Sequence, residues 1–201
     1  MRLRNTAACF AFLLSFTNFA HARGDLLQGI PLQWTPNTTL AEMGAVDISG
    51  ALLTMPIYFD AFTDQRQNPS LVGENREDAA KAKPVTTSTD VAKFVGEHVR
   101  AQLRTAGLNV TDAPTGIRIS AEIRQFFVTE TDDYRGEMSL LIHVRNGAGK
   151  ELWTGIANGG AENFGRSYRA DNYCETISNM IMRATYNLLA NASFREALQK
   201  G

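Results

Sequence analysis

The side chains with the greatest chemical potential in this sequence are Cys174, His98 and His143. Cys174 is a candidate nucleophile, but a thiol with an ordinary pKa of about 8.5 needs a neighbouring base to become a thiolate. It shares a helical face with Ile177 and Ile181, so we predict that the thiol packs against a sheet. Neither histidine has a partner at the i, i+4 spacing of a two-histidine metal site, which favours two isolated histidines.

Four acidic residues surround a predicted turn and offer the oxygen ligands that hard cations prefer: Glu130, Asp132, Asp133 and Glu137. The segment lacks the register of a calcium-binding loop and the glycine at the sharp bend of such a loop. Arg135 lies inside the cluster and opposes cation binding. We therefore predict a solvated hairpin turn here.

Gly155, Gly159 and Gly160 raise the question of a phosphate cradle. No G-x-G-x-x-G motif opens a helix, and no P-loop register follows. The glycine pair 159–160 is instead predicted to bend or end a strand. Because no serine has the context of a nucleophile elbow either, we assign no catalytic, cofactor-binding or metal-binding residue and expect no cofactor.

The N-terminus has the pattern of a secretion signal. Arg2 and Arg4 precede an apolar run over 7–16, and small residues follow at Ala20 and Ala22. The run is too short to span a bilayer, so we predict cleavage after Ala22 and export to the periplasm. A form that keeps the signal and stays attached to the membrane is the alternative.

The composition after the predicted cleavage excludes several function classes. The remaining chain has 18 basic and 21 acidic residues, because residues 1–22 contain two of the 20 basic residues and none of the 21 acidic ones. This balance lacks the basic footprint of a nucleic-acid-binding domain, and no later segment is apolar enough for an integral membrane span. Cys9 leaves with the signal, so Cys174 has no disulfide partner within the chain. Cys9 also precedes most of the apolar run, where no lipid anchor is expected.

The remaining chain is predicted to form an N-terminal leader over 23–50 and one α+β domain over 51–201. In the leader, Trp34 and Leu40 are expected to attach to the body. The apolar pattern then predicts a strand over 52–62, a helix ending at Gly107 and a short strand at 108–110. A three-strand antiparallel meander follows, with strands over 117–128, 138–144 and 152–157, and a second long helix comes after it. We expect a two-layer sandwich in which two main helices cover one face of a mixed or antiparallel sheet of about four to five strands.

Polar residues at the expected helix starts predict the caps. Ser88 or Thr89 is expected to cap the first helix, with Asp90 at the positive end of its dipole. Asn172 and Ser193, each followed three residues later by glutamate, predict capping boxes for the second helix and for a short closing helix through Leu198.

The polar stretch Thr63–Ser88 is predicted to be a long loop. It contains Pro69, Gly73 and Pro84 and charges of both signs. Loops of this length in compact domains are usually functional or disordered, so the stretch is either a mobile insertion or a binding loop.

The order of these elements, with particular residues in them, resembles the YajG-like family of bacterial envelope lipoproteins. The resemblance covers roughly Leu52–Leu198 and is carried by the runs FTDQR (62–66), GLNV (107–110), IRISAEI (117–123), NGAGK (146–150) and SFREAL (193–198). It implies a small α+β envelope protein without enzymatic chemistry and brings no site residues with it. Members of that family carry a lipidated cysteine at the mature N-terminus, whereas this chain has Arg23 there.

These observations lead to two hypotheses about function. The first is a non-catalytic periplasmic or secreted protein that binds another envelope component through the outer face of the meander or through the 63–88 stretch. The second is a secreted hydrolase of unrecognised type that uses Cys174, His98 or the acidic turn. The sequence names neither a partner nor an oligomeric state.

Overall fold

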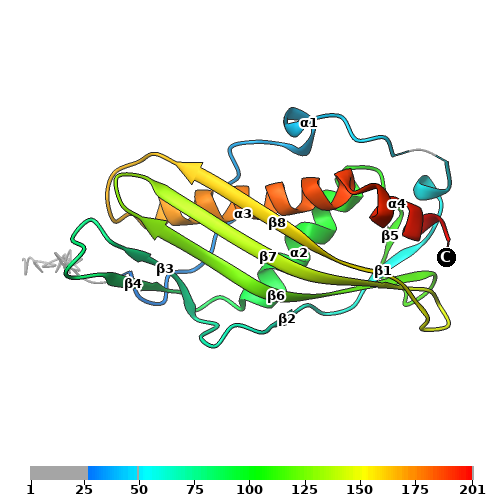
Figure 1. The fold of residues 1–201 in the computed structure, drawn as a ribbon, viewed down its shortest axis with the longest axis horizontal. Helices are drawn as coiled ribbons and strands as arrows, with labels where there is room; N and C mark the ends of the chain where they lie inside the picture. The colour runs from blue at the N-terminus through cyan, green and yellow to red at the C-terminus, as the bar shows by residue number, and fades with distance from the viewer. Residues whose placement is uncertain (1–26, 49, 201) are drawn as a thin grey trace, which may run out of the picture.

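The structure, a computed structural model, describes residues 27–48 and 50–200, so the predicted signal and its cleavage site lie outside the described residues. A mixed sheet forms one layer and the helices lie against one of its faces (Figure 1). The strands are β1 (Ile57–Phe59), β2 (Thr63–Asp64), β3 (Leu71–Asn75), β4 (Lys83–Thr86), β5 (Val110–Thr111), β6 (Ile117–Glu130), β7 (Tyr134–Arg145) and β8 (Glu151–Asn163). The helices are α1 (Leu40–Met43), a 3-10 turn (Gly50–Leu53), α2 (Val91–Thr105), α3 (Ala170–Ala190) and α4 (Ala192–Gln199).

The central strand of the sheet is β6. One of its edges pairs along its whole length with β7 in antiparallel fashion, and β8 pairs with the far side of β7. The other edge pairs in turn with β1, β2 and β3, all parallel to β6. The long chain segment from β1 to β3 therefore runs beside β6 as one interrupted strand.

The predicted three-strand meander is confirmed, with longer strands than the sequence indicated. Buried and exposed positions alternate along β6 and β7, as period-two apolar patterning predicts. Ile119, Ile123, Leu140 and Ile142 are buried on the inner face. Their burial against the helices holds the opposite side chains of the same strands on the outer face.

The prediction of four to five strands was too low, because the described part of the chain forms an eight-stranded sheet. The stretch Thr63–Ser88, predicted to be a loop, contains β2, β3 and β4, and β3 pairs with both β4 and β6. Arg66 fixes the turn between β2 and β3: its guanidinium donates to the carbonyls of Leu71 and Phe126 at 2.7 and 3.0 Å and pairs with Asp64. The strand predicted over 52–62 was too long, since a 3-10 turn occupies 50–53 and β1 begins at Ile57.

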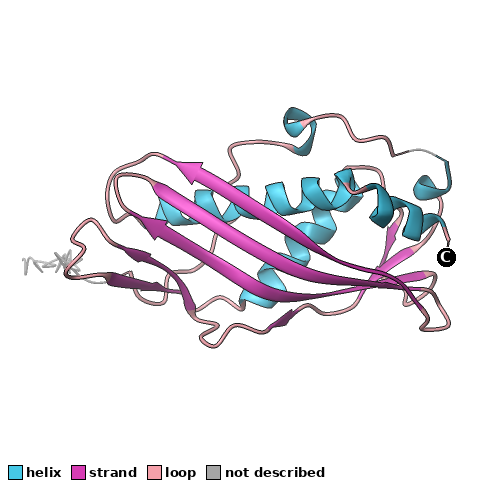
Figure 2. Cartoon of the chain, in the orientation of Figure 1, coloured by secondary structure: helices cyan, strands magenta, loops and turns pink. Residues whose placement is uncertain are grey.

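Both predicted long helices are confirmed, and Figure 2 shows them on one side of the sheet. Each has a stripe of buried apolar residues. The predicted caps shift by one to three residues. Asp90 caps α2 by accepting from the amide of Lys93, and Asn191 caps α4 by accepting from the amide of Phe194. The residue before α3 is Arg169, and its side chain makes no capping bond. Gly107 follows α2 with φ of 98°, the left-handed conformation expected at a helix end.

The strand β8 and the helix α3 approach closely at Gly159. A Cβ atom placed there would lie 2.0 Å from the backbone oxygen of Met180, so only glycine allows this approach. Of the two alternatives predicted for Gly159 and Gly160, the end of a strand was wrong, because both lie within β8. The glycine at 159 brings α3 against the strand.

The segment 27–48 packs on the helical layer, as we predicted from Trp34 and Leu40. The indole of Trp34 stacks on the imidazole of His98, with ring centroids 4.1 Å apart and an interplanar angle of 7°. Ile30 and Leu32 are buried within the same hydrophobic core as the domain. Of the helices in residues 27–48 and 50–200, none combines the length and apolarity that a membrane crossing requires.

Candidate functional site

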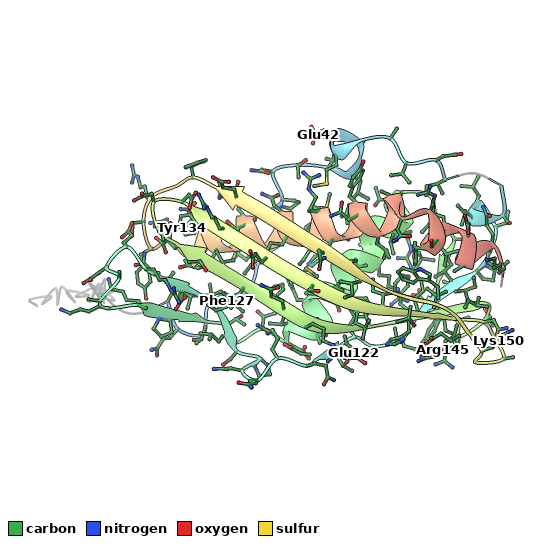
Figure 3. The ribbon with its side chains drawn as sticks, viewed as in Figure 1. Glu42, Glu122, Phe127, Tyr134, Arg145 and Lys150 are labelled. Carbon is green, nitrogen blue, oxygen red and sulfur yellow. The ribbon has the colours of Figure 1, made fainter. Side chains whose placement is uncertain are left out.

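The outer face of β6, β7 and β8 is the candidate binding surface. The helices pack against the opposite face, so the side chains of every second residue of the meander point away from them. Glu122, Phe127 and Arg145, labelled in Figure 3, lie along this part of the sheet. The position of this face follows directly from the alternation that the sequence shows.

A row of three polar side chains crosses the outer face at its centre. Ser120 lies opposite His143 on β7, and His143 lies opposite Thr154 on β8. The Nδ1 atom of His143 is 3.1 Å from a carboxylate oxygen of Glu151 and 3.0 Å from the hydroxyl of Thr154. Its Nε2 atom faces Glu122, with 3.9 Å between the nitrogen and the carboxylate oxygen. We call these five residues the His143 row.

The His143 row is held by hydrogen bonds and lies beside charged side chains at the surface. The hydrogen bond from His143, assisted by Thr154, lowers the pKa of Glu151. Arg145 donates to the hydroxyl of Ser120 at 3.4 Å. Glu122 also pairs with Arg124, and the side chains of Glu122, His143 and Glu151 each keep some exposure to solvent.

An apolar pair adjoins the His143 row. Leu141 lies opposite Ile156 on the neighbouring strand, and Ile156 is 60% exposed. Large hydrophobic side chains at such exposure are uncommon in the described part of the chain, where Leu53 and Phe164 are the other two. An apolar centre within a polar surround is the arrangement typical of protein-binding surfaces.

The structure separates the residues that the sequence singled out for chemistry. His143 points outward on the sheet, as predicted. His98 lies on α2 between Trp34 and Phe94, where burial lowers the pKa of its imidazole. These aromatic contacts make it a packing residue.

Cys174 is buried, but it does not pack against the sheet as predicted. Its sulfur lies 3.7 Å from the carbonyl oxygen of Pro31, under the N-terminal segment. The thiol also adjoins a cavity of about 470 Å³ between that segment and the start of α3. Burial raises the pKa of Cys174, which opposes thiolate formation.

The prediction of a solvated acidic turn was wrong for two of its residues. Glu130 is 1% exposed, and its carboxylate accepts from the hydroxyl of Tyr173 at 2.7 Å and from the backbone amide of Tyr168 at 2.5 Å. Asp133 is buried and pairs with Arg135, whose hydrogen bond lowers the pKa of that carboxyl group. Among the residues described, no group of three or more His, Cys, Asp or Glu side chains is arranged to hold a metal ion.

Glu130 belongs to a second polar row, on the inner face. Paired positions on four adjacent strands place Asn75, Glu130, Tyr134 and Asn163 side by side. Tyr173 covers this row from α3, and burial, followed by the Glu130 hydrogen bond, raises the pKa of its phenol far above the usual range. We call these five residues the Glu130 cluster.

Sequence reasoning did not find the partners of either polar row. In the sequence pattern, nothing distinguishes Glu122, Glu151 and Thr154 from other polar residues of the strands. The cross-strand register alone brings them to His143. The available signal was the alternation itself, which could have paired His143 with Ser120 once the turn length was known. No comparable signal exists for Glu130 and Tyr173, which are 43 residues apart.

No family model matches the sequence, and no curated protein matches it. The fold is similar to that of a protein of family DUF330 from Xanthomonas campestris, with a TM-score of 0.53 and 8% sequence identity over 68% of this chain and 82% of that chain.

Two further solved structures are more distant. Lipoprotein GNA1162 from Neisseria meningitidis has a TM-score of 0.34 and 14% identity over 56% of this chain and 88% of that one. The L103M variant of PelC from Paraburkholderia phytofirmans, a dodecamer, has a TM-score of 0.44 and 11% identity over 72% of this chain and 95% of that one. The structural neighbours thus include a DUF330 protein and a bacterial lipoprotein. At these identities the comparison concerns the fold, and the resemblance to the YajG-like family in particular stays a prediction.

Proposed function

We propose that this protein is a non-catalytic envelope protein that binds another envelope component through the outer face of β6, β7 and β8. One observation carries the proposal: the helices and the N-terminal segment pack on one face of the sheet, and the opposite face presents the His143 row beside the Leu141–Ile156 pair. The predicted secretion signal, which lies outside the described residues, supports a location in the periplasm.

The placement of the reactive side chains favours a binding role over a hydrolase. Cys174 lies under the N-terminal segment, His98 packs between aromatic rings, and Glu130 is bound by two donors. Catalysis by a cysteine needs a thiolate with a base in hydrogen-bond reach, whereas burial raises the pKa of Cys174.

Thiol labelling tests the absence of a cysteine nucleophile. We expect the native protein to react with a thiol reagent at neutral pH at least about a hundredfold more slowly than the unfolded protein, because the reagent needs local opening to reach Cys174. A native rate equal to or above the unfolded rate would support the hydrolase hypothesis instead.

Site-specific photo-crosslinking in the native envelope tests the binding surface. A benzophenone amino acid at Ser139, on the outer face, is expected to yield a discrete adduct, and the same probe at the exposed Lys93 on α2 is the matched control. Ile156→Glu should abolish the Ser139 adduct, because it places a charge in the apolar pair. Equal adducts from Ser139 and Lys93, or an adduct that survives Ile156→Glu, would contradict the proposal.

A further inference from the structure

The last strand of the meander, β8, has one edge to which no described element is paired. It is the outermost strand on its side of the sheet (Figure 1), and its ladder partner among the described residues is β7 alone. The strand runs for 13 residues, longer than the two to five residues of β1 to β5. An edge of this length is a template for pairing with another extended chain.

The register identifies the backbone groups that face outward. Beyond a register shift next to the turn, the β7–β8 pairing is regular from Val144–Trp153 to Tyr134–Asn163, and hydrogen-bonded and non-hydrogen-bonded pairs alternate along this part of the ladder. This alternation turns the N–H and C=O groups of five residues away from β7: Thr154, Ile156, Asn158, Gly160 and Glu162. The side chain of Asn187 on α3 donates to the carbonyl of Asn158 at 2.8 Å, which agrees with that direction.

Several of the usual protections of a free edge are missing from the 154–162 part of this strand, and the register shift of the β7–β8 pair lies outside it, next to the turn. Natural edges are protected by proline, by lysine, by short length or by a covering element. β8 contains no proline, lysine or arginine, and its five outward-facing residues are all exposed. Asn187 engages one of the outward carbonyls. The remaining groups can form a ladder with an added strand.

The side chains of β8 determine which residues of an added strand would pair with it favourably. Glu151 and Glu162, near the two ends, are about half exposed and are the charged residues of the strand. Ile156 stands between them on the outer face. A second copy of β8 in antiparallel pairing would bring the glutamates of the two copies near each other, which is unfavourable. A basic residue at each end and a β-branched or aromatic residue opposite Ile156 would be favourable.

We propose that the free edge of β8 binds an extended segment of a partner protein that carries Lys or Arg near both ends and a β-branched or aromatic residue at its centre. The segment adds a ninth strand to the sheet through main-chain hydrogen bonds. This inference rests on the proposed function, since it names the kind of partner that this side of the molecule binds.

The probe is a synthetic peptide of β8 length, with alternating threonine and valine and a lysine at each end. We expect it to slow amide hydrogen exchange of Thr154, Ile156 and Gly160 by about tenfold or more, while the amides of the intervening residues already bond to β7 and change little. Peptides N-methylated at alternate amides, or with glutamate at the ends, should bind at least about tenfold more weakly. Saturating peptide that leaves these amides unchanged would overturn the proposal.

Gly160 supplies the matched variants. Gly160→Pro removes an outward N–H without removing a bond to β7, and proline is tolerated at such edge positions. Gly160→Ala is the control, because its Cβ would meet only the oxygen of Gly136 at 4.0 Å. We expect Gly160→Pro to lose peptide binding and Gly160→Ala to keep it. Should Gly160→Pro fail to fold, the methylated peptide on the unaltered protein decides the question.

Two outcomes separate this inference from the proposed function. If the Ser139 adduct persists in Gly160→Pro while peptide binding is lost, the outer-face function stands and the native partner does not use the edge. If Ser139 gives no adduct in any variant, the proposed function fails, and the exchange measurement alone decides the edge. Protection of the edge amides that grows with protein concentration in the absence of peptide would assign the edge to a second copy and overturn the proposal.

Discussion

The two faces of the sheet carry polar rows of similar make-up in opposite surroundings. The Glu130 cluster crosses β3, β6, β7 and β8 under α3, and the His143 row crosses β6, β7 and β8 on the open side. Each has a carboxylate hydrogen-bonded to neighbouring groups. Glu130 is 1% exposed, whereas the side chain of Glu151 is 52% exposed.

This difference in burial assigns the two rows different roles. A buried carboxylate loses its hydration and must be bound by donors, so Tyr173 and the amide of Tyr168 are obligatory partners of Glu130. Those contacts fix the start of α3 on the sheet. The exposed groups of the His143 row can exchange their contacts with water or with a partner at little cost.

The largest expected effect on stability comes from replacing Glu130. Glu130→Ala leaves the buried hydroxyl of Tyr173 without its acceptor and should lower the free energy of unfolding by about 3 kcal/mol. At this chain length that corresponds to a drop of roughly 6–12 °C in Tm. Glu130→Gln keeps an acceptor oxygen and should cost about half as much. Thermal and urea unfolding of both variants measure the effect, and equal losses would show that the acceptor does not matter.

A second, smaller effect is expected where the sheet meets α3. Gly159→Ala puts a Cβ against the backbone of Met180 and should destabilise the protein by about 2 kcal/mol. Gly160→Ala, one residue along and on the opposite face, should change the stability by less than about 0.5 kcal/mol. Urea unfolding of the two variants compares the faces directly. A similar loss from both would refute the close approach of α3 to β8.

On the outer face, His143→Ala should shift Tm by only about 1–2 °C, because its contacts are partly solvated. A shift as large as that of Glu130→Ala would remove the contrast between the two rows. The measurement is thermal unfolding of the variant beside the unaltered protein at the same pH.

The smallest expected effect is on the pKa of one carboxyl group, that of Glu151. His143→Ala removes the main cause of the lowered pKa of Glu151, so that pKa should rise toward its usual value. Since the folded-state pKa is lowered, the associated stabilisation is present above the unfolded-state pKa and is lost as the pH falls through the folded-state value. Carboxyl-detected NMR titration measures the shift. Thr154→Val should raise the pKa less, because the bond from Thr154 is the second cause.

The parts of the fold that the sequence predicted are those with local periodicity. The alternation from Ile117 to Ala157 predicted the meander, and the stripes containing Phe94 and Ile177 predicted α2 and α3. The stretch from Thr63 to Ser88 gave no such signal, because β3 and β4 have five and four residues and contain Gly73 and Pro84. Their pairing depends on β6, which comes later in the chain.

The apolar side of each long strand and helix follows from the amino-acid sequence alone, and so do the two layers and the outward position of His143. Which residues meet depends on the tertiary structure: Glu130 meets Tyr173, Cys174 meets Pro31, and His143 meets Glu151. The physical reason is that periodicity is fixed by the backbone geometry of one element, whereas these contacts depend on strand register, on helix placement and on how much water each group loses.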